Sequence, residues 1–128
     1  MGEHPNATVF RDLIGAFNSG DMEAITSIID DDVVWHEIGK AEPVRGRAAL
    51  GESMLDFPAD VNVTADLHDV VANDDHVVGL ISATAVGGER TLEYRTAEIM
   101  HMSNGKVTER WSFSDDTAQI IEFFSHFG

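Results

Sequence analysis

The sequence contains no cysteine and has few basic residues, and each shortage narrows the functions that remain. Without cysteine there can be no disulfide, thiolate nucleophile or cysteine-ligated metal, which fits a cytoplasmic protein. The 8 basic and 23 acidic residues give a formal net charge of −15, which repels phosphate backbones and anionic membrane surfaces. We therefore expect no nucleic acid and no membrane as a partner. A high-salt cytoplasm and an ordinary acidic surface both fit this charge, and we favour the second.

Long apolar runs, targeting signals and internal repeats are also missing. No run approaches the roughly 20 residues that cross a membrane, and the first residues lack the basic and apolar regions of a signal peptide. Hydrophobic residues make up 43% of the chain and charged residues 24%, which is an ordinary globular balance. The 128 residues therefore predict a single domain over residues 1–128 with one core.

Motifs for metals, cofactors and nucleophiles are missing as well. The six histidines show no His-Glu-x-x-His spacing, and no Gly-x-Ser-x-Gly elbow occurs. Gly87-Gly88 falls between two expected strands and not before a helix, so it is not a phosphate loop. We expect neither a metal nor a cofactor, although histidines from separate segments could still meet in the folded chain.

The first half of the chain reads mainly as helix. Apolar residues from Val9 to Phe17 recur at helical spacing, and Gly20 followed by Asp21 suits the end of one helix and the N-cap of the next. Three aspartates at positions 30–32 then end the second helix. The pattern predicts helices at residues 5–18, 21–29 and 47–56, a strand at 33–38 and a loop at 39–46.

The second half changes to β-branched, alternating strands joined by tight turns. Asn104-Gly105 is the strongest hairpin signal, because this pair favours type I′ turns. Residues 114–117 supply a cap for a short C-terminal helix that runs to Phe127. Helices grouped on one face of a curved, mostly antiparallel sheet give an α+β fold with a pocket between the layers. The strands are predicted at residues 61–67, 76–86, 90–102 and 106–113.

Glu98 is the most informative residue, because it lies on the apolar face of an expected strand. At the strand period of two, this face is otherwise apolar or weakly polar, which predicts that it turns toward the core or a cavity. A carboxylate in such a place is costly unless it is paired, hydrogen-bonded or protonated. The face carries Leu92, Tyr94, Thr96, Glu98, Met100 and Met102.

Glu37 has a similar position, since it shares a strand face with Val33 and Trp35. Two acids aimed into one apolar space can perform acid/base chemistry, because burial and a second carboxylate both raise the pKa of a carboxyl group. Alternatively, each acid is satisfied by an arginine or a backbone donor and does nothing more. The residues leave both interpretations open.

Arg110 is the next candidate, because the Asn104-Gly105 turn brings it near Thr96 or Glu98 on the neighbouring strand. An arginine there can hold a carboxylate or a substrate oxygen in a two-pronged contact. A simple cross-strand ion pair is the alternative. If the Trp111 face of the last strand turns inward instead, Arg110 points to solvent.

Four segments of the sequence point to a known family: residues 17–25 (FNSGDMEAI), 30–39 (DDDVVWHEIG), 45–50 (RGRAAL) and 98–114 (EIMHMSNGKVTERWSFS). With these segments the chain resembles the SnoaL-like polyketide cyclase and ketosteroid isomerase superfamily. The likeness covers nearly the whole chain, and it implies a nuclear-transport-factor-2-like cone, in which a curved sheet wraps around helices and encloses a deep apolar pocket. Members are usually dimeric, which implies a homodimer through the sheet.

The resemblance also implies roles for single residues. Glu37 stands where a ketosteroid isomerase has its aspartate base, and Glu98 where it has a protonated aspartic acid. Leu13 stands at the position of the oxyanion tyrosine. Both acids here are glutamates, one methylene longer than aspartate. The family also contains cyclases, dehydratases and epoxide hydrolases, so it implies an acid/base pocket and no particular reaction.

Together these observations predict a small-molecule enzyme of the isomerase, cyclase or hydratase/dehydratase type. Glu37 would take a proton next to a carbonyl or activate water, while Glu98 or Arg110, assisted by Tyr94, stabilises the oxygen charge. The substrate would be a small, apolar, oxygenated molecule like a polyketide, steroid or terpenoid. The alternative is a non-catalytic ligand-binding or dimerisation module with neutralised acids. The expected pocket residues are Trp35, Tyr94, Thr96, Ser112 and Leu13.

Overall fold

The computed structural model describes residues 3–55 and 57–127, and within them the chain forms the expected α+β fold. Asp56, the last residue of the helix predicted at 47–56, lies outside the described residues. No helix within the described ranges has the length and hydropathy needed to cross a membrane. The elements are α1 (Pro5–Ser19), α2 (Met22–Ile28), β1 (Ile29–Trp35), β2 (Val44–Arg45), α3 (Arg47–Leu55), β3 (Val61–Ala72), β4 (His76–Gly87), β5 (Arg90–Ser103), β6 (Lys106–Ser114) and α4 (Thr117–Ser125).

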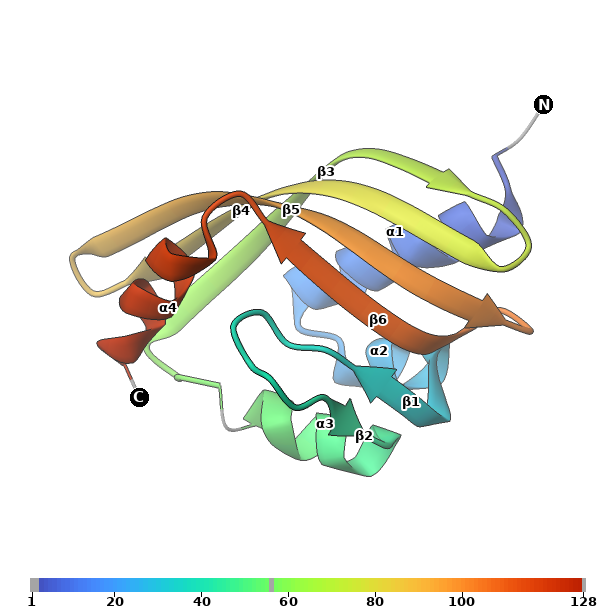
Figure 1. The fold of residues 1–128 in the computed structure, drawn as a ribbon, viewed down its shortest axis with the longest axis horizontal. Coiled ribbons are helices and arrows are strands. Elements are labelled where there is room, and N and C mark those ends of the chain that lie inside the picture. The colour runs from blue at the N-terminus through green and yellow to red at the C-terminus, as the bar shows by residue number, and fades with distance from the viewer. Residues whose placement is uncertain (1–2, 56, 128) are drawn as a thin grey trace.

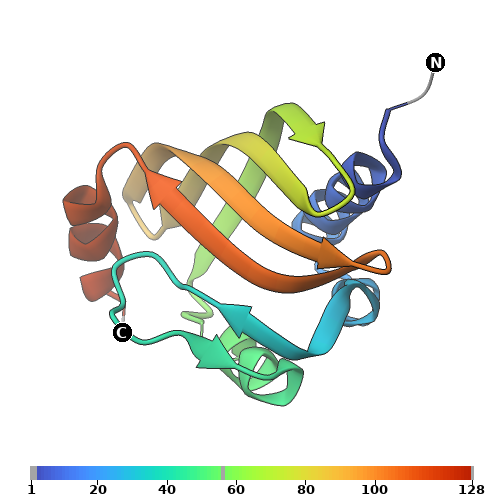
Figure 2. The same cartoon turned by 45° about the vertical axis from the view of Figure 1, so that its right-hand side comes forward.

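The strands form one curved, unclosed sheet in the order β2-β1-β6-β5-β4-β3. Strands β3 to β6 make the predicted antiparallel meander, while β1 runs parallel to β6. Helix α1 lies across one face of the sheet, and α4 lies at the far end of the hairpin between β4 and β5 (Figures 1 and 2). Among the residues that the structure describes, no helix covers the other face of the central strands (Figures 1 and 2).

The tight turns and caps follow the chemistry of their residues. Asn104 and Gly105 have φ angles of 53° and 76°, the left-handed values that a type I′ turn requires. Gly20 ends α1 with a φ of 72°, and the Asp21 side chain accepts a hydrogen bond from the backbone N–H of Ala24. Asp116 caps α4 in the same way. These local signals place the ends of α1 and α2 and the turn between β5 and β6 close to the predicted positions. The strand predicted at 61–67 is longer, because β3 continues its pairing with β4 to Ala72.

The strand predicted at 33–38 is displaced, because β1 begins at Ile29 and ends at Trp35. Ile29 and Val33 are fully buried and anchor the strand, while the aspartates between them turn largely toward solvent, so their polarity does not break it. The loop predicted at 39–46 contains β2, which pairs with the end of β1. Glu37 therefore lies in the turn beyond the strand and not on its face.

The core forms where α1 packs on the sheet. Phe10 is 1% exposed and lies on Gly79 of β4, where a methyl group would come within 2.3 Å of the phenyl ring. Only glycine allows the helix to approach the strand so closely. The same helix places Leu13 and Ala16 on its buried side. The close approach of α1 to β4 fixes one wall of the space described below.

We predict that Gly79→Ala destabilises the protein by about 1–3 kcal/mol, because the added methyl group overpacks against Phe10. Gly15→Ala on the same helix is the control, since nothing lies within 4 Å of the added methyl group. That change should raise stability by about 0.5–1 kcal/mol. Urea denaturation measures both, and equal midpoints for the Gly79→Ala variant and the natural chain would contradict the close packing.

Candidate functional site

Two adjoining hollows lie between the sheet and the helices. The outer hollow has a volume of about 770 Å³ and the inner hollow about 230 Å³. The outer volume falls within the range of pockets that bind small molecules, which is roughly 300–1,000 Å³. Because the two hollows share wall residues, one ligand can extend from one into the other. The shared residues are Phe17, Ile38, Val63, Tyr94 and Arg110.

The inner hollow gathers most of the residues selected from the sequence. Its walls are largely apolar, and its polar groups come from β5 and β6. Thr96 and Glu98 are buried, as the strand pattern predicts for their face. Leu13 enters from α1 and Trp35 from the end of β1. The predicted residues that line this hollow are Leu13, Trp35, Tyr94, Thr96, Glu98, Arg110 and Ser112.

A bulge in β6 decides which way Arg110 points. Val107 pairs with Met102, and the next pair joins Glu109 with His101, so Thr108 is an extra residue without a partner of its own. The extra residue reverses the alternation along the strand. Val107 therefore points inward before the bulge, and Arg110 points inward after it, although simple alternation would place the two on opposite faces.

Because of the bulge, the pairing of β6 with β5 differs from the one expected from the sequence. Arg110 lies opposite Met100, while Ser112 lies opposite Glu98, so Arg110 reaches Glu98 diagonally and not from the directly paired position. Trp111 takes the outer face of the sheet, which answers the question that alternation left open. The register thus gives Glu98 two polar neighbours on β6, one opposite and one diagonal.

Glu98 is held by three donors. Its Oε1 accepts hydrogen bonds from Nε and Nη2 of Arg110 at 2.9 and 2.7 Å, and its Oε2 accepts one from the Ser112 hydroxyl. The side chains of Glu98 and Arg110 are only 8% and 14% exposed. Both oxygens of the Glu98 carboxyl group therefore have hydrogen-bond donors. A buried charge is tolerated where it is paired in this way.

Arg110 is held in turn by the end of β1. Its Nη1 donates to the backbone carbonyl of His36 at 2.9 Å, and its Cζ lies 4.6 Å from the ring centroid of Trp35. Within the described residues, three of the five N–H groups of this guanidinium are engaged by Glu98 and His36, which leaves two. Since Arg110 lines both hollows, these two can serve a ligand.

Glu37 lines the outer hollow and is less enclosed than Glu98. Its Oε1 accepts a hydrogen bond from the Ser53 hydroxyl at 2.8 Å, and its Oε2 lies 3.3 Å from Nζ of Lys40. Its side chain is 24% exposed. The two acids thus occupy different hollows, with Arg110 and Tyr94 in the wall that both hollows share.

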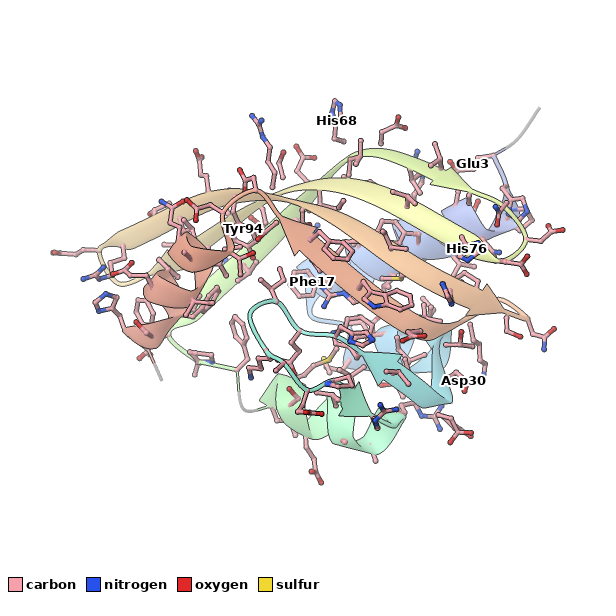
Figure 3. The ribbon with its side chains drawn as sticks, viewed as in Figure 1. Glu3, Phe17, Asp30, His68, His76 and Tyr94 are labelled. Atoms are coloured by element: carbon pink, nitrogen blue, oxygen red, sulfur yellow. The ribbon has the colours of Figure 1, made fainter. Side chains whose placement is uncertain are left out.

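Tyr94, labelled in Figure 3, is the only tyrosine of the chain and lines both hollows. Burial raises the pKa of its phenol above the ordinary value, the negative charge of Glu98 raises that pKa further, and the positive charge of Arg110 lowers it. Burial and Glu98 outweigh Arg110. At neutral pH the phenol therefore keeps its proton and can donate a hydrogen bond to a ligand oxygen.

Sequence patterns did not reveal Ser53, Lys40 or the His36 carbonyl as parts of the site. Ser53 comes from α3, and its contact with Glu37 depends on the path of the intervening loop, for which no periodicity exists. Lys40 carried a weak signal, because it is one of two lysines and lies three residues from Glu37.

His68 points away from the body at the sheet edge (Figure 3). The described part of the chain contains no group of three acidic or histidine residues arranged to hold a metal ion.

We predict that Glu98→Gln lowers the pKa of Tyr94, because the variant removes a negative charge that raises it and leaves the charge of Arg110 in place. Tyrosinate absorbance near 295 nm measures this directly, since one tyrosine gives the whole signal. Glu93→Gln is the control, because it removes the same charge from an exposed position on β5. An unchanged phenol pKa in Glu98→Gln would show that Tyr94 does not sense the pair.

Comparisons with known proteins agree with this architecture. Bal32a, from a soil-derived mobile gene cassette, is 28% identical over 94% of this chain and 96% of its own, with a TM-score of 0.85. IdmH, a putative polyketide cyclase from Streptomyces antibioticus, is 26% identical over 94% and 99%, with a TM-score of 0.72. An epoxide hydrolase of the LEH-like type from M. tuberculosis, 13% identical over 96% and 91%, shares the fold with a TM-score of 0.80.

A search of curated proteins finds no match. The profile of the SnoaL-like domain, in contrast, matches residues 10–110, which span most of α1, most of the sheet and most of the residues that line the two hollows. The matched range includes both acids and ends at Arg110. The chain therefore belongs to the SnoaL-like domain family and has its nuclear-transport-factor-2-like fold.

Proposed function

We propose that this chain is a cofactor-independent enzyme that moves a proton on a small, apolar, oxygenated molecule. The observation that carries the proposal is the outer hollow of about 770 Å³, which is lined by the acid Glu37 and by two hydrogen-bond donors, Tyr94 and Arg110. A base and hydrogen-bond donors facing one apolar space are what carbonyl chemistry requires. The similarity to a putative polyketide cyclase, IdmH, supports a substrate of the polyketide kind.

The step itself is a proton transfer. Glu37 takes a proton from the carbon next to a carbonyl, the electron pair of the broken C–H bond forms the C=C bond of an enolate, and the π pair of the carbonyl moves onto its oxygen. The Tyr94 hydroxyl and the two remaining N–H groups of Arg110 donate to that oxygen while it carries negative charge. In an isomerisation, Glu37 then returns the proton to another carbon of the extended enolate. In a cyclisation, the enolate carbon attacks a second carbonyl of the substrate, the π bond of that carbonyl breaks, and Glu37 returns the proton to the resulting alkoxide oxygen.

Glu37 serves better as the base than Glu98. The oxygens of Glu98 are occupied by three donors from Arg110 and Ser112, so a proton transfer there would disrupt the buried ion pair. Glu37 has a single short hydrogen bond, from Ser53, and a longer contact with Lys40. We therefore assign Glu98 to holding Arg110 in place, whereas the resemblance to ketosteroid isomerase suggested a proton donor at that position.

A non-catalytic binding module is the second candidate, because both acids lie beside cations. Glu98 is paired with Arg110, and Glu37 lies near Lys40. The two candidates differ in one measurable property. An enzyme of the proposed type exchanges the acidic protons of a bound ketone with solvent, and a binding module does not.

We predict that the protein accelerates hydrogen–deuterium exchange of apolar ketones such as 2-tetralone in deuterium oxide. Glu37→Gln should lower this rate by about 10²- to 10⁴-fold, which is the usual contribution of a general base. Proton NMR follows the exchange, and tryptophan fluorescence checks that the ketones still bind. Glu93→Gln, an exposed change of equal charge, should keep the natural rate. Ketones that bind without any acceleration would favour the binding module.

We also propose that a second copy of the chain covers the outer face of the sheet. Leu80, Ala97 and Phe113 are register partners on three neighbouring strands, and Leu80 and Phe113 are 44% and 58% exposed. Val78, Ile99 and Trp111 form a second row beside them. In a chain with a net charge of −15, an apolar face is where two copies can meet with little repulsion.

We predict a mass of twice 14.0 kDa for the natural chain in light scattering. Phe113→Glu should shift it toward the monomer, because the new carboxylate would be buried against its own copy across the two-fold axis. Leu55→Glu is the control, since Leu55 is 81% exposed on α3, away from the sheet face. A natural chain that stays monomeric at micromolar concentration would contradict the proposed dimer.

A further inference from the structure

One residue, His36, connects the outer face of the sheet with the site inside it. Its ring stacks on the indole of Trp111, with centroids 5.2 Å apart and planes 8° from parallel. Its Nε2 lies 2.9 Å from Oε2 of Glu109. Both contacts are on the face opposite the hollows, because Trp111 and Glu109 alternate with the inward-pointing Arg110 and Ser112.

The backbone of the same residue is tied to Arg110 twice. The N–H of His36 donates to the backbone carbonyl of Arg110 at 2.9 Å, and the carbonyl of His36 accepts from the Arg110 guanidinium at 2.9 Å. The next residue, Glu37, then turns into the outer hollow. His36 thus supplies both the stacked ring and the carbonyl that anchors Arg110, and the next residue, Glu37, is the proposed base.

We propose that His36 is a positioning residue, whose ring is clamped by Trp111 and Glu109 and thereby holds Arg110 and Glu37 in place. The part that concerns Glu37 rests on the proposed function, while the part that concerns Arg110 rests only on the hydrogen bonds and contacts described. His36 touches no ligand in this proposal and acts through its carbonyl and its neighbour.

The path of the chain explains why a clamp is needed at this point. Pairing of β1 with β2 ends at Trp35 and Val44, and pairing with β6 ends at Trp35 and Arg110. Beyond Trp35 the chain leaves the ladder of paired strands, and its backbone is tied to β6 at His36, through the N–H bond to the Arg110 carbonyl and the carbonyl bond from the Arg110 side chain. A segment that leaves a sheet regains backbone freedom, and side-chain contacts must restrain it.

The clamp itself is well braced. Trp111 also contacts the ring of His101 on β5, edge to face at 4.8 Å, and His101 in turn contacts His76 at 4.6 Å. Trp111 is thus in contact with two imidazoles, one from β5 and one from the segment just beyond β1. The side chains of His36 and Glu109 are 33% and 30% exposed, so substitutions there change the clamp without opening the core.

Three variants separate the contacts of the clamp. His36→Ala removes both the stacking and the contact with Glu109, His36→Phe keeps the stacking alone, and Glu109→Gln keeps the imidazole but removes the charge. His126→Ala is the matched control, because Nε2 of His126 lies 2.8 Å from Oε1 of Glu122 on the exposed side of α4. Thermal melts confirm that each variant is folded before it is compared.

The first readout is the phenol titration of Tyr94 at 295 nm. Because the charge of Arg110 lowers the pKa of Tyr94, a guanidinium that has lost its anchor lowers it less. We expect the phenol pKa to rise in His36→Ala, to rise less in His36→Phe, and to stay unchanged in His126→Ala. If His36 contributed only to stability, His36→Ala would lower the melting temperature and leave the pKa of Tyr94 unchanged.

The second readout is ketone exchange in deuterium oxide. His36→Ala should lower kcat by about 10- to 100-fold with little change in KM. A displacement of the base and the donors by about 1 Å disturbs their alignment with the reacting atoms of the ketone, but it leaves the apolar walls that bind the ketone intact. His36→Phe should recover part of that loss. If the natural chain shows no exchange, the proposed function fails, and the Tyr94 titration still decides the positioning role.

A folded His36→Ala with the natural Tyr94 titration would overturn the proposal, whatever its exchange rate. If His36→Ala does not fold, the same criterion applies to His36→Phe and Glu109→Gln, which keep most of the side-chain volume. A shift in His126→Ala as large as that in His36→Ala would also overturn it, because loss of any His–Glu pair would then produce the effect.

Discussion

The buried pair of Glu98 and Arg110 is the interaction on which the rest of the site depends. A carboxylate on a side chain that is 8% exposed is costly without donors, and β6 supplies them from two positions. The need to pair Glu98 with donors also determines how β6 and the end of β1 are arranged. The bulge at Thr108 turns Arg110 inward, and the guanidinium that results reaches across to the His36 carbonyl at the end of β1. Removal of one partner would leave an unpaired buried charge, which is why such pairs behave as a unit.

The pair also divides the labour between the two acids. Glu98 is saturated by its donors and acts on the site through Arg110, whereas Glu37 lies at the wall of the larger hollow with lone pairs to spare. Position within a shared fold therefore does not fix the role of a residue. Tyr94 lies on β5 and not at the position of Leu13, where the family resemblance would put the oxyanion tyrosine. The donor and the hollow are present, but they are assembled from other elements.

Much of the fold and several of the site residues could be predicted from the sequence, because they depend on interactions between residues that are close together along the chain. The faces of β5, the Asn104-Gly105 turn and the cap of α2 follow from alternation and from turn and cap chemistry. What could not be predicted depends on contacts between distant segments. The bulge at Thr108 exists because β6 must pair with β5 while both Val107 and Arg110 point inward, and single-strand alternation contains no trace of it. The end of β1, and with it the place of Glu37, is set by β2 and β6.

The charges around the hollows give a reason why the ligand should be uncharged. Within the described residues that line them, the cations Arg110 and Lys40 each lie beside a glutamate, so an entering anion would have to compete with a carboxylate already in place. Glu52 adds a further negative charge to the outer hollow, and the net charge of −15 acts in the same direction. A neutral carbonyl meets no such competition, because its oxygen needs only the phenol of Tyr94 and the remaining N–H groups of Arg110. The negative charge of the chain and the paired cations in the hollows therefore both support the neutral, oxygenated substrate of the proposed function over an acidic one.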